Sequence, residues 1–239
     1  MDLRILFENG DMVAVEKPQG MPAQPDRTGD ADLFSLLSAQ MKQELGLVHR
    51  LDRPVGGIMV FAKTKQAEAT LSKMMQAGGW RKSYLAVLWG TLEEKSGTWT
   101  DYLFKNARTN LSEVVSASRK GAKKAILHYK VLAETVWNEQ PLSLVEITLE
   151  TGRHHQIRVQ TSHHGAPIWG DRKYNTLQPM RGVGNMALWS WKLEGKWEKQ
   201  KEGFSIRSLP SDMPFSLFSE KFVSNLIFIC LSYTRRPPK

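Results

Sequence analysis

Asp52 stands between two arginines in the string His49-Arg50-Leu51-Asp52-Arg53-Pro54. Neighbouring guanidinium groups favour the ionised form of a carboxyl group, so the string predicts a charged carboxylate where a strand ends in a turn. An ionised carboxylate can serve as a nucleophile or as a general base. An aspartate in an ordinary surface ion pair has the same local signature, and the six residues by themselves leave both interpretations open.

Two further strings carry side chains of the kinds found in active sites. The first is Lys82-Ser83-Tyr84-Leu85-Ala86-Val87-Leu88-Trp89-Gly90. The second is Thr151-Gly152-Arg153-His154-His155-Gln156-Ile157-Arg158-Val159, which continues to His163-His164-Gly165-Ala166-Pro167-Ile168-Trp169-Gly170-Asp171. A tyrosine ring stacked on a nucleobase contributes about 1–3 kcal/mol. Without further context, a strand tyrosine that fills the core is the better explanation of Tyr84.

Histidine pairs raise the possibility of a metal site, and their spacing argues against it. Four of the six histidines lie in the pairs His154-His155 and His163-His164. Adjacent side chains on a helix or strand point in different directions, so a doublet rarely supplies two ligands to one ion. A single cysteine, Cys230, cannot build a thiolate site. We expect no metal ion and no cofactor.

The charge balance favours a polyanionic partner. Thirty-three Lys and Arg residues against 24 Asp and Glu residues give a formal net charge of +9. Cations that neutralise phosphates release condensed counterions, which favours binding to nucleic acid. The densest basic segment contains Lys105, Arg108, Arg119, Lys120, Lys123 and Lys124. A merely solvated basic face is the alternative for any one of these side chains.

The ends of the chain show no targeting signal. The N-terminal residues lack an apolar core with a cleavage site, and the apolar run Leu226 to Leu231 is far shorter than the ~20 residues that span a membrane. One cysteine excludes an intrachain disulfide, which fits a reducing compartment. These features predict a cytoplasmic protein without a membrane partner.

The elements that must position these residues are short and strand-rich. Apolar runs at 5–7 and 12–15 flank Asn9-Gly10, a hairpin signal because both residues tolerate positive φ. We expect helices at 32–43, from the N-cap Thr64 to Gly78-Gly79, and from Thr151-Gly152 to Gly165. Strands are expected at 46–51, 58–62, 80–89 and 145–149.

Many short strands with few helices predict an α+β fold with mixed or antiparallel β-sheets, forming a central cleft flanked by helices. We expect one catalytic domain over residues 1–211. Residues 212–239 show no clear period and are interpreted as a C-terminal tail of unknown role.

In sequence order, the strings around Asp52, Tyr84 and Arg158 resemble the motifs of RluA-type RNA pseudouridine synthases. The string from Lys123 to Leu132 is similar to a further strand of that family. The resemblance runs from about residue 5 to about residue 193. It departs at Val55-Gly56 and at Gln160-Thr161, which lie beside the catalytic positions. It leaves no room for the small S4-type domain that precedes the catalytic domain in many relatives.

The resemblance implies roles for individual residues. Asp52 is expected to be the catalytic carboxylate, Arg158 the cation that pairs with it, and Tyr84 the active-site aromatic. Arg50 is expected to enter the RNA stack in place of the flipped uridine. RNA contacts are further expected from His49, Arg53, Lys120, Lys123 and Lys124.

The implied reaction isomerises specific uridines of structured RNA (tRNA, rRNA or both) to pseudouridine, with no obligate protein partner. The sequence leaves open whether Asp52 attacks carbon 1′ of the sugar or removes the 2′ proton. A glycosidase would usually need two matched carboxylates, and these motifs supply one aspartate with arginines. The remaining alternative is a non-catalytic RNA-binding protein that retains the fold.

Overall fold

The structure is a computed structural model and describes residues 2–177, 184–196 and 203–218. Its helices are α1 (Leu33–Met41), α2 (Lys65–Gln76) and α3 (Gln156–His163), with the 3-10 helix η1 at Phe215–Phe218. Its strands are β1 (Ile5–Glu8), β2 (Met12–Lys17), β3 (Gly46–Leu47), β4 (Gly56–Ala62), β5 (Trp80–Trp89), β6 (Ser96–Asn106), β7 (Leu111–Val114), β8 (Lys123–Trp137), β9 (Gln140–Leu149), β10 (Leu188–Lys196) and β11 (Gly203–Arg207). The predicted α+β class is confirmed.

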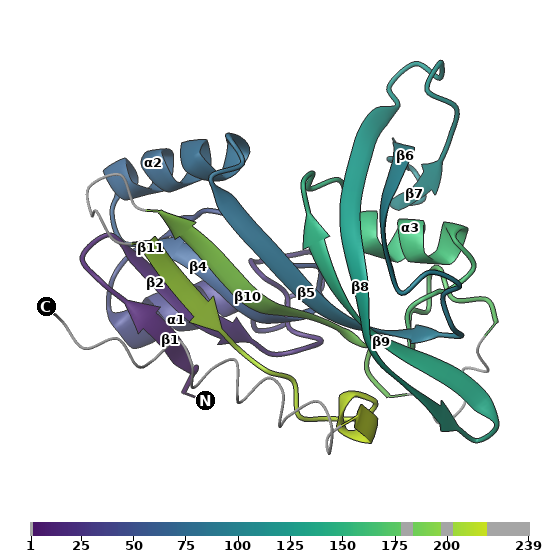
Figure 1. Ribbon diagram of the computed structural model, residues 1–239. Coiled ribbons are helices and arrows are strands. Elements are labelled where there is room, and N and C mark those ends of the chain that lie inside the picture. The colour runs from purple at the N-terminus through teal and green to yellow at the C-terminus, as the bar shows by residue number, and fades with distance from the viewer. Residues whose placement is uncertain (1, 178–183, 197–202, 219–239) are drawn as a thin grey trace, which may run out of the picture.

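The strands of the described residues form one mixed sheet with the order β1-β2-β4-β10-β5-β9-β8-β6-β7, while β3 pairs with β4 and β11 with β10. Only β4 and β10 run parallel; the other pairs described are antiparallel. Figure 1 shows two diverging wings, with β1, β2, β4 and β11 in one and β6 to β9 in the other. β5 and β10 run toward the junction of the wings.

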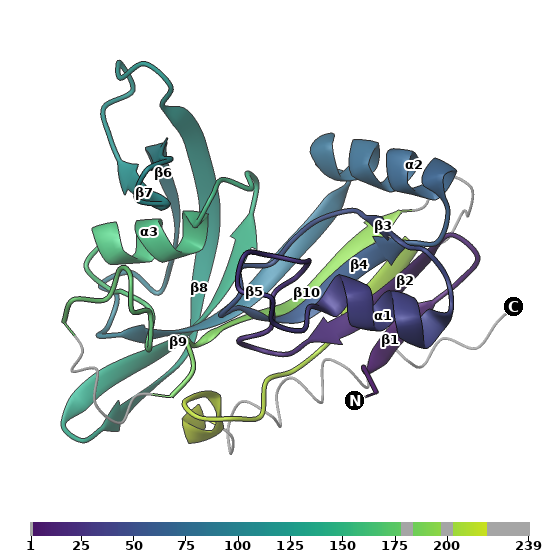
Figure 2. The same cartoon turned by 180° about the vertical axis from the view of Figure 1, so that it is seen from behind.

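Helices α1 and α2 cover opposite faces of the first wing, as Figures 1 and 2 show. The reason is the two-residue period of the buried strands. Val13 and Val15 of β2 share a hydrophobic cluster with Leu33 and Leu37 of α1. The intervening residues Met12 and Ala14 turn to the other face and share a cluster with Ala67 and Leu71 of α2. A strand buried on both faces therefore holds a helix on each side.

Short polar side chains cap the first two helices, and the N-cap predicted at Thr64 is confirmed. Asp32 Oδ1 accepts a hydrogen bond of 2.9 Å from Ser35 N at the start of α1. Thr64 Oγ1 accepts one of 3.1 Å from Ala67 N at the start of α2. A short polar side chain at this position satisfies a backbone N–H that has no partner inside the helix.

Three local predictions need correction. The strand predicted to reach Leu51 ends at Leu47, because the chain leaves the sheet there for the loop that carries Asp52. The third helix begins only at Gln156 and ends at His163. Asn9-Gly10 does form the first turn, but neither residue has a positive φ. Instead Asn9 Oδ1 accepts hydrogen bonds from the backbone N–H groups of Asp11 and Met12.

The start of the predicted tail packs against the core. Phe215 and Phe218 of η1 are buried in the main hydrophobic cluster, and η1 contacts β8. The rest of the tail, residues 219–239, lies outside the described residues. In the described parts of the chain, no helix is long and apolar enough to cross a membrane.

Candidate active site

Asp52 lies in the loop between β3 and β4, at the inner end of the first wing. Val55 N donates a 2.9 Å hydrogen bond to Asp52 O, which closes a turn around the carboxylate. Arg53 O accepts from Gly20 N at 2.9 Å and from Lys17 Nζ at 3.0 Å. The backbone just after Asp52 is therefore tied to the end of β2 and to the loop that follows it.

Lys17 is a fully buried lysine whose ammonium group organises that loop. Besides Arg53 O, its Nζ donates to Pro18 O at 2.9 Å and to Met21 O at 2.7 Å. Burial lowers the pKa of Lys17 to about 7, although the nearby charge of Asp52 acts in the opposite direction. Three carbonyl acceptors match the three donors of an ammonium group. Lys17 thus fixes where the turn holding Asp52 can lie.

Arg158 pairs with Asp52, as the resemblance implied. Its Nη1 lies 3.3 Å from Asp52 Oδ2, while its Nε and Nη2 each donate to Asp171 at 2.7 Å. Burial of Arg158 would lower its pKa, but the hydrogen bonds to Asp171 together with the negative charges of Asp171 and Asp52 outweigh that effect and raise the pKa. Because a bidentate pair fixes the guanidinium plane, Asp171 aims the remaining N–H of Arg158 at Asp52.

His155 also faces the Asp52 carboxylate, with Nε2 3.5 Å from Oδ2. Its other ring nitrogen, Nδ1, lies 2.8 Å from the hydroxyl of Tyr174. The ring stacks on His154, with centroids 3.7 Å apart. His155 has a left-handed backbone with φ 53° and precedes the first residue of α3. Sequence reasoning assigned a role to neither residue, although His155 lies in the motif string from Thr151 to Asp171 and Tyr174 lies three residues beyond it.

A cavity of about 430 Å³ opens beside Asp52. Tyr84 of β5 is buried in its wall, and burial raises the pKa of its hydroxyl, so the side chain stays neutral. Val55, Leu149, Ile157 and Leu188 also line the cavity. It therefore offers an aromatic and aliphatic surface beside one carboxylate, which suits a flat polar ring such as a nucleobase.

Basic side chains surround the same cavity, namely Arg50, Lys82, Lys105, Arg153 and Arg158. Lys82 precedes Tyr84 by two residues on the same face of β5, and burial lowers its pKa. The alternation of a strand is a signal that could have placed Lys82 in the pocket from the sequence.

A second cavity of about 800 Å³ is also lined by Asp52 and shares Arg50, Leu51, Lys105, His155 and Arg158 with the first. Its wall also includes Arg53, Arg172 and Lys173. Asp52 thus lines two adjoining hollows with cationic walls. A polyanion reaching Asp52 would pass along these cations.

The three other residues predicted from the first motif string have different surroundings. Arg50 is exposed at both cavities, and no hydrogen bond of its guanidinium is found among the described residues. Arg53 donates to Gly20 O at 2.9 Å and pairs with Asp26 and Asp30. His49 Nε2 accepts from Val60 N at 3.1 Å.

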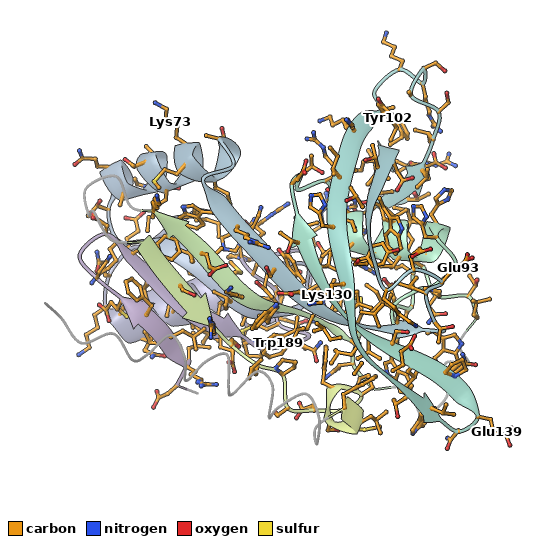
Figure 3. All side chains as sticks on the ribbon, viewed as in Figure 1. Lys73, Glu93, Tyr102, Lys130, Glu139 and Trp189 are labelled. Carbon is orange, nitrogen blue, oxygen red and sulfur yellow. The ribbon has the colours of Figure 1, made fainter. Side chains whose placement is uncertain are left out.

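The predicted RNA-binding lysines lie away from both cavities. Lys120, Lys123 and Lys124 are exposed where the loop after β7 enters β8. Lys124 is in register with Tyr102, which Figure 3 labels near the upper end of the second wing. Lys73 on α2, labelled in the same figure, lies on the first wing. Lys120, Lys123 and Lys124 therefore belong to the outer end of the second wing and not to the pocket that holds Asp52.

A family model described as RNA pseudouridylate synthase matches residues 11–163, which contain Asp52, Tyr84 and Arg158. The chain belongs to the RNA pseudouridylate synthase family. The resemblance to RluA-type synthases is thereby confirmed. Within the residues that the structure describes, no group of three or more His, Cys, Asp or Glu side chains is arranged to hold a metal ion.

Relatives of this synthase-family chain include bacterial proteins. It is 35% identical to an uncharacterised RNA pseudouridine synthase of Bacillus subtilis, YhcT, over 72% of this chain and 58% of the relative. It is 32% identical to tRNA pseudouridine synthase C of Haemophilus ducreyi, over 76% and 77% of the two chains. The chain thus spans less than two thirds of the length of the Bacillus relative.

The fold is shared with a solved structure, that of human RNA pseudouridylate synthase domain containing 1. The match has a TM-score of 0.78 and covers 90% of this chain and 86% of the other. The identity is 22%, so this likeness concerns the fold.

Proposed function

We propose that this synthase-family chain isomerises specific uridines of structured RNA to pseudouridine, with Asp52 as its catalytic carboxylate. The observation that carries the proposal is the convergence of Asp52, Tyr84 and Arg158 on one cavity from three separate elements. The members of this constellation come from the loop before β4, from β5 and from α3. The non-catalytic alternative gives no reason for the three to stay together.

The reaction begins with removal of the target uridine from its stack, at a cost of a few kcal/mol. Arg50 fills the vacated position, because its guanidinium is exposed at the mouth of both cavities. Tyr84 then packs against the flipped base in the first cavity, where base–aromatic stacking contributes about 1–3 kcal/mol.

Asp52 acts next on the sugar of that nucleotide. Either its carboxylate attacks carbon 1′ as the bond to N1 breaks, or it removes the 2′ proton as the base leaves. The base turns and carbon 5 bonds to carbon 1′, which breaks the bond between Asp52 and carbon 1′ in the first route and is accompanied by return of the proton to carbon 2′ in the second. The proton on carbon 5 is lost, and N1 gains a proton. Product and substrate contain the same atoms, so this reaction needs no redox cofactor or cosubstrate.

Both routes require an ionised carboxylate with a free oxygen. Arg158 supports this requirement because a charge-assisted pair favours the ionised form and fixes its direction. The aliphatic and aromatic pocket wall limits water near the reacting atoms, which strengthens electrostatic interactions inside the site.

Replacement of the carboxylate tests the proposal. Purified wild-type protein and Asp52→Asn are incubated with transcribed tRNA and with total RNA that lacks pseudouridine, and pseudouridine is mapped by nucleotide. We expect modification at defined uridines by the wild type, none above background with Asp52→Asn, and RNA affinity within about threefold. A folded Asp52→Asn protein that still modifies RNA would overturn the role of Asp52.

The same experiment distinguishes the enzyme from the alternative, a non-catalytic RNA-binding protein. If the wild type binds RNA but forms no pseudouridine on either substrate, the chain is an RNA-binding protein with a synthase fold. The Haemophilus ducreyi relative is a tRNA pseudouridine synthase, which makes tRNA the first substrate to test, with rRNA second. We further propose a cytoplasmic location for this RNA-modifying activity.

A further inference from the structure

His155 lies in a chain of polar contacts that ends at the Asp52 carboxylate. Ser112 N, in a buried residue of β7, donates a 2.8 Å hydrogen bond to Tyr174 Oη. Tyr174 Oη in turn lies 2.8 Å from His155 Nδ1. His155 Nε2 lies 3.5 Å from Asp52 Oδ2. The chain therefore joins a backbone amide to the candidate catalytic group through two side chains.

The direction of each hydrogen bond follows from the first donor. The amide N–H must donate, so the tyrosine oxygen accepts from it. A phenol has one proton to donate, and His155 Nδ1 is the acceptor in reach. With Nδ1 accepting, a neutral imidazole carries its proton on Nε2. That proton then sits on the nitrogen that faces an anionic oxygen of Asp52 at 3.5 Å, whereas the other tautomer would set a lone pair against it.

We propose that His155 is a positioning residue, held by Tyr174 in the Nε2–H tautomer so that it turns the Asp52 carboxylate and leaves Oδ1 as the reactive oxygen. This inference rests on the proposed function of Asp52. It assigns no proton transfer to His155.

The position of the two donors explains the choice of oxygen. His155 Nε2 and Arg158 Nη1 both approach Oδ2, at 3.5 and 3.3 Å. Among the described residues, no hydrogen bond is made to Oδ1. Two donors on one oxygen stabilise its charge and fix the rotation of the carboxylate, while the other oxygen stays available to the sugar.

Burial supports a neutral ring in this role. The buried setting lowers the pKa of His155 to about 4, despite the opposing charge of Asp52. Burial also raises the pKa of Tyr174, so its hydroxyl keeps the proton that it donates. At pH 7 His155 is therefore a fixed dipole, and Arg158 supplies the cation.

Two amide variants separate positioning from a structural role. The amide nitrogen of glutamine reaches the place of Nε2, so His155→Gln keeps a donor to Asp52 and loses the partner of Tyr174. The shorter asparagine matches Nδ1, so His155→Asn keeps an acceptor for Tyr174 and loses the donor to Asp52. Thermal melting of both variants and of the wild type verifies that each protein is folded under the assay conditions.

Single-turnover rates and apparent KM on a modified RNA are measured for both. We expect His155→Asn to lower the rate about 10–100-fold, as for loss of a hydrogen bond to a charged group, with KM within about twofold. His155→Gln should be at least about ten times faster than His155→Asn. The reverse order, or equal loss in both, would overturn the positioning role.

Tyr174→Phe tests the link to the tautomer. In the wild-type background, we expect loss of the hydroxyl to slow the reaction, because the ring is no longer held with its proton on Nε2. In the His155→Gln background the same change should alter the rate less than about twofold, since an amide has no such tautomers. Equal losses in both backgrounds would contradict the inference.

The tautomer is also observable without turnover. Nitrogen NMR of the protein labelled at histidine, with His155→Gln to assign the signal, should show His155 protonated on Nε2 and unprotonated on Nδ1 at pH 7. A proton on Nδ1 would overturn the inference even in an active enzyme. If instead the wild type modifies no RNA, the proposed function fails, and the NMR result still decides the orientation of His155.

Discussion

At the scale of single residues, His49 is a motif histidine whose ring makes a structural contact within the fold. Its Nε2 accepts from the backbone of Val60 in β4. Burial, with a smaller contribution from the charge of Lys82, lowers the pKa of His49 to about 3. The ring is therefore neutral at any pH where the protein would act, and it ties the loop before Asp52 to the sheet.

This burial predicts a pH-dependent stability. An unfolded histidine with a pKa near 6.5 binds a proton below that value, while folded His49 stays neutral down to about pH 3. Stability is thus fully present above pH 6.5 and is lost as the pH falls toward 3, at up to about 1.4 kcal/mol per pH unit. His155 acts in the same direction down to about pH 4.

His49→Gln keeps an acceptor for Val60 N and removes the titration. We expect the drop in unfolding free energy between pH 6 and pH 5 to be about 1 kcal/mol smaller in His49→Gln than in the wild type. Urea denaturation at the two pH values measures it. An unchanged difference would mean that His49 is protonated in the folded protein.

At the scale of elements, the close approach of β4 to β10 depends on a glycine. Gly57 has φ 104°, and a Cβ there would lie 2.7 Å from Ser190 N and closer still to its carbonyl oxygen. Gly57 pairs with Ser190 in the parallel contact of β4 with β10. Since β4 follows directly on the loop that carries Asp52, this contact helps to fix the position of that loop relative to β10.

Gly57→Ala should therefore be strongly destabilising, and Gly90→Ala is a matched control. Gly90 has nearly the same φ, 108°, but its Cβ would meet nothing within 4 Å. The backbone strain, about 1–3 kcal/mol, is common to both. We expect Gly57→Ala to cost at least about 2 kcal/mol more than Gly90→Ala in chemical denaturation. Equal losses of unfolding free energy in the two variants would show that β10 can move away from the added Cβ at no cost in stability.

At the scale of the whole molecule, the basic surface of the second wing is separate from the catalytic pocket. Lys120, Lys123 and Lys124 are exposed at its outer end and line neither cavity. The loop between β7 and β8 projects beyond the sheet in Figure 1. An RNA long enough to reach from Asp52 to this end would contact both.

Charge reversal tests that surface. In Lys120→Glu/Lys123→Glu/Lys124→Glu we expect weaker RNA binding and a log affinity against log salt slope less steep by about two. The control reverses Lys42, Lys73 and Lys196, which are exposed, form no ion pair among the described residues and change the net charge equally. Equal effects in both triple variants would indicate attraction by total charge and reject a contact at this wing.

The sequence by itself determined the family motifs and much of the local structure. Motif strings singled out Asp52, Tyr84 and Arg158 as candidates for the chemistry, and the N-cap Thr64 placed the start of α2. These features depend on neighbours a few residues away, where spacing and side-chain type are sufficient.

Only the tertiary structure decided which groups surround the carboxylate. The burial of Lys17, the parallel insertion of β10 beside β4, and the hydrogen bonds from Ser112 through Tyr174 to His155 all join segments far apart in the chain. Such contacts depend on strand order and register, which local periodicity does not encode. His155, a histidine in a motif string, therefore gained its tyrosine partner only when the fold brought Tyr174 beside it.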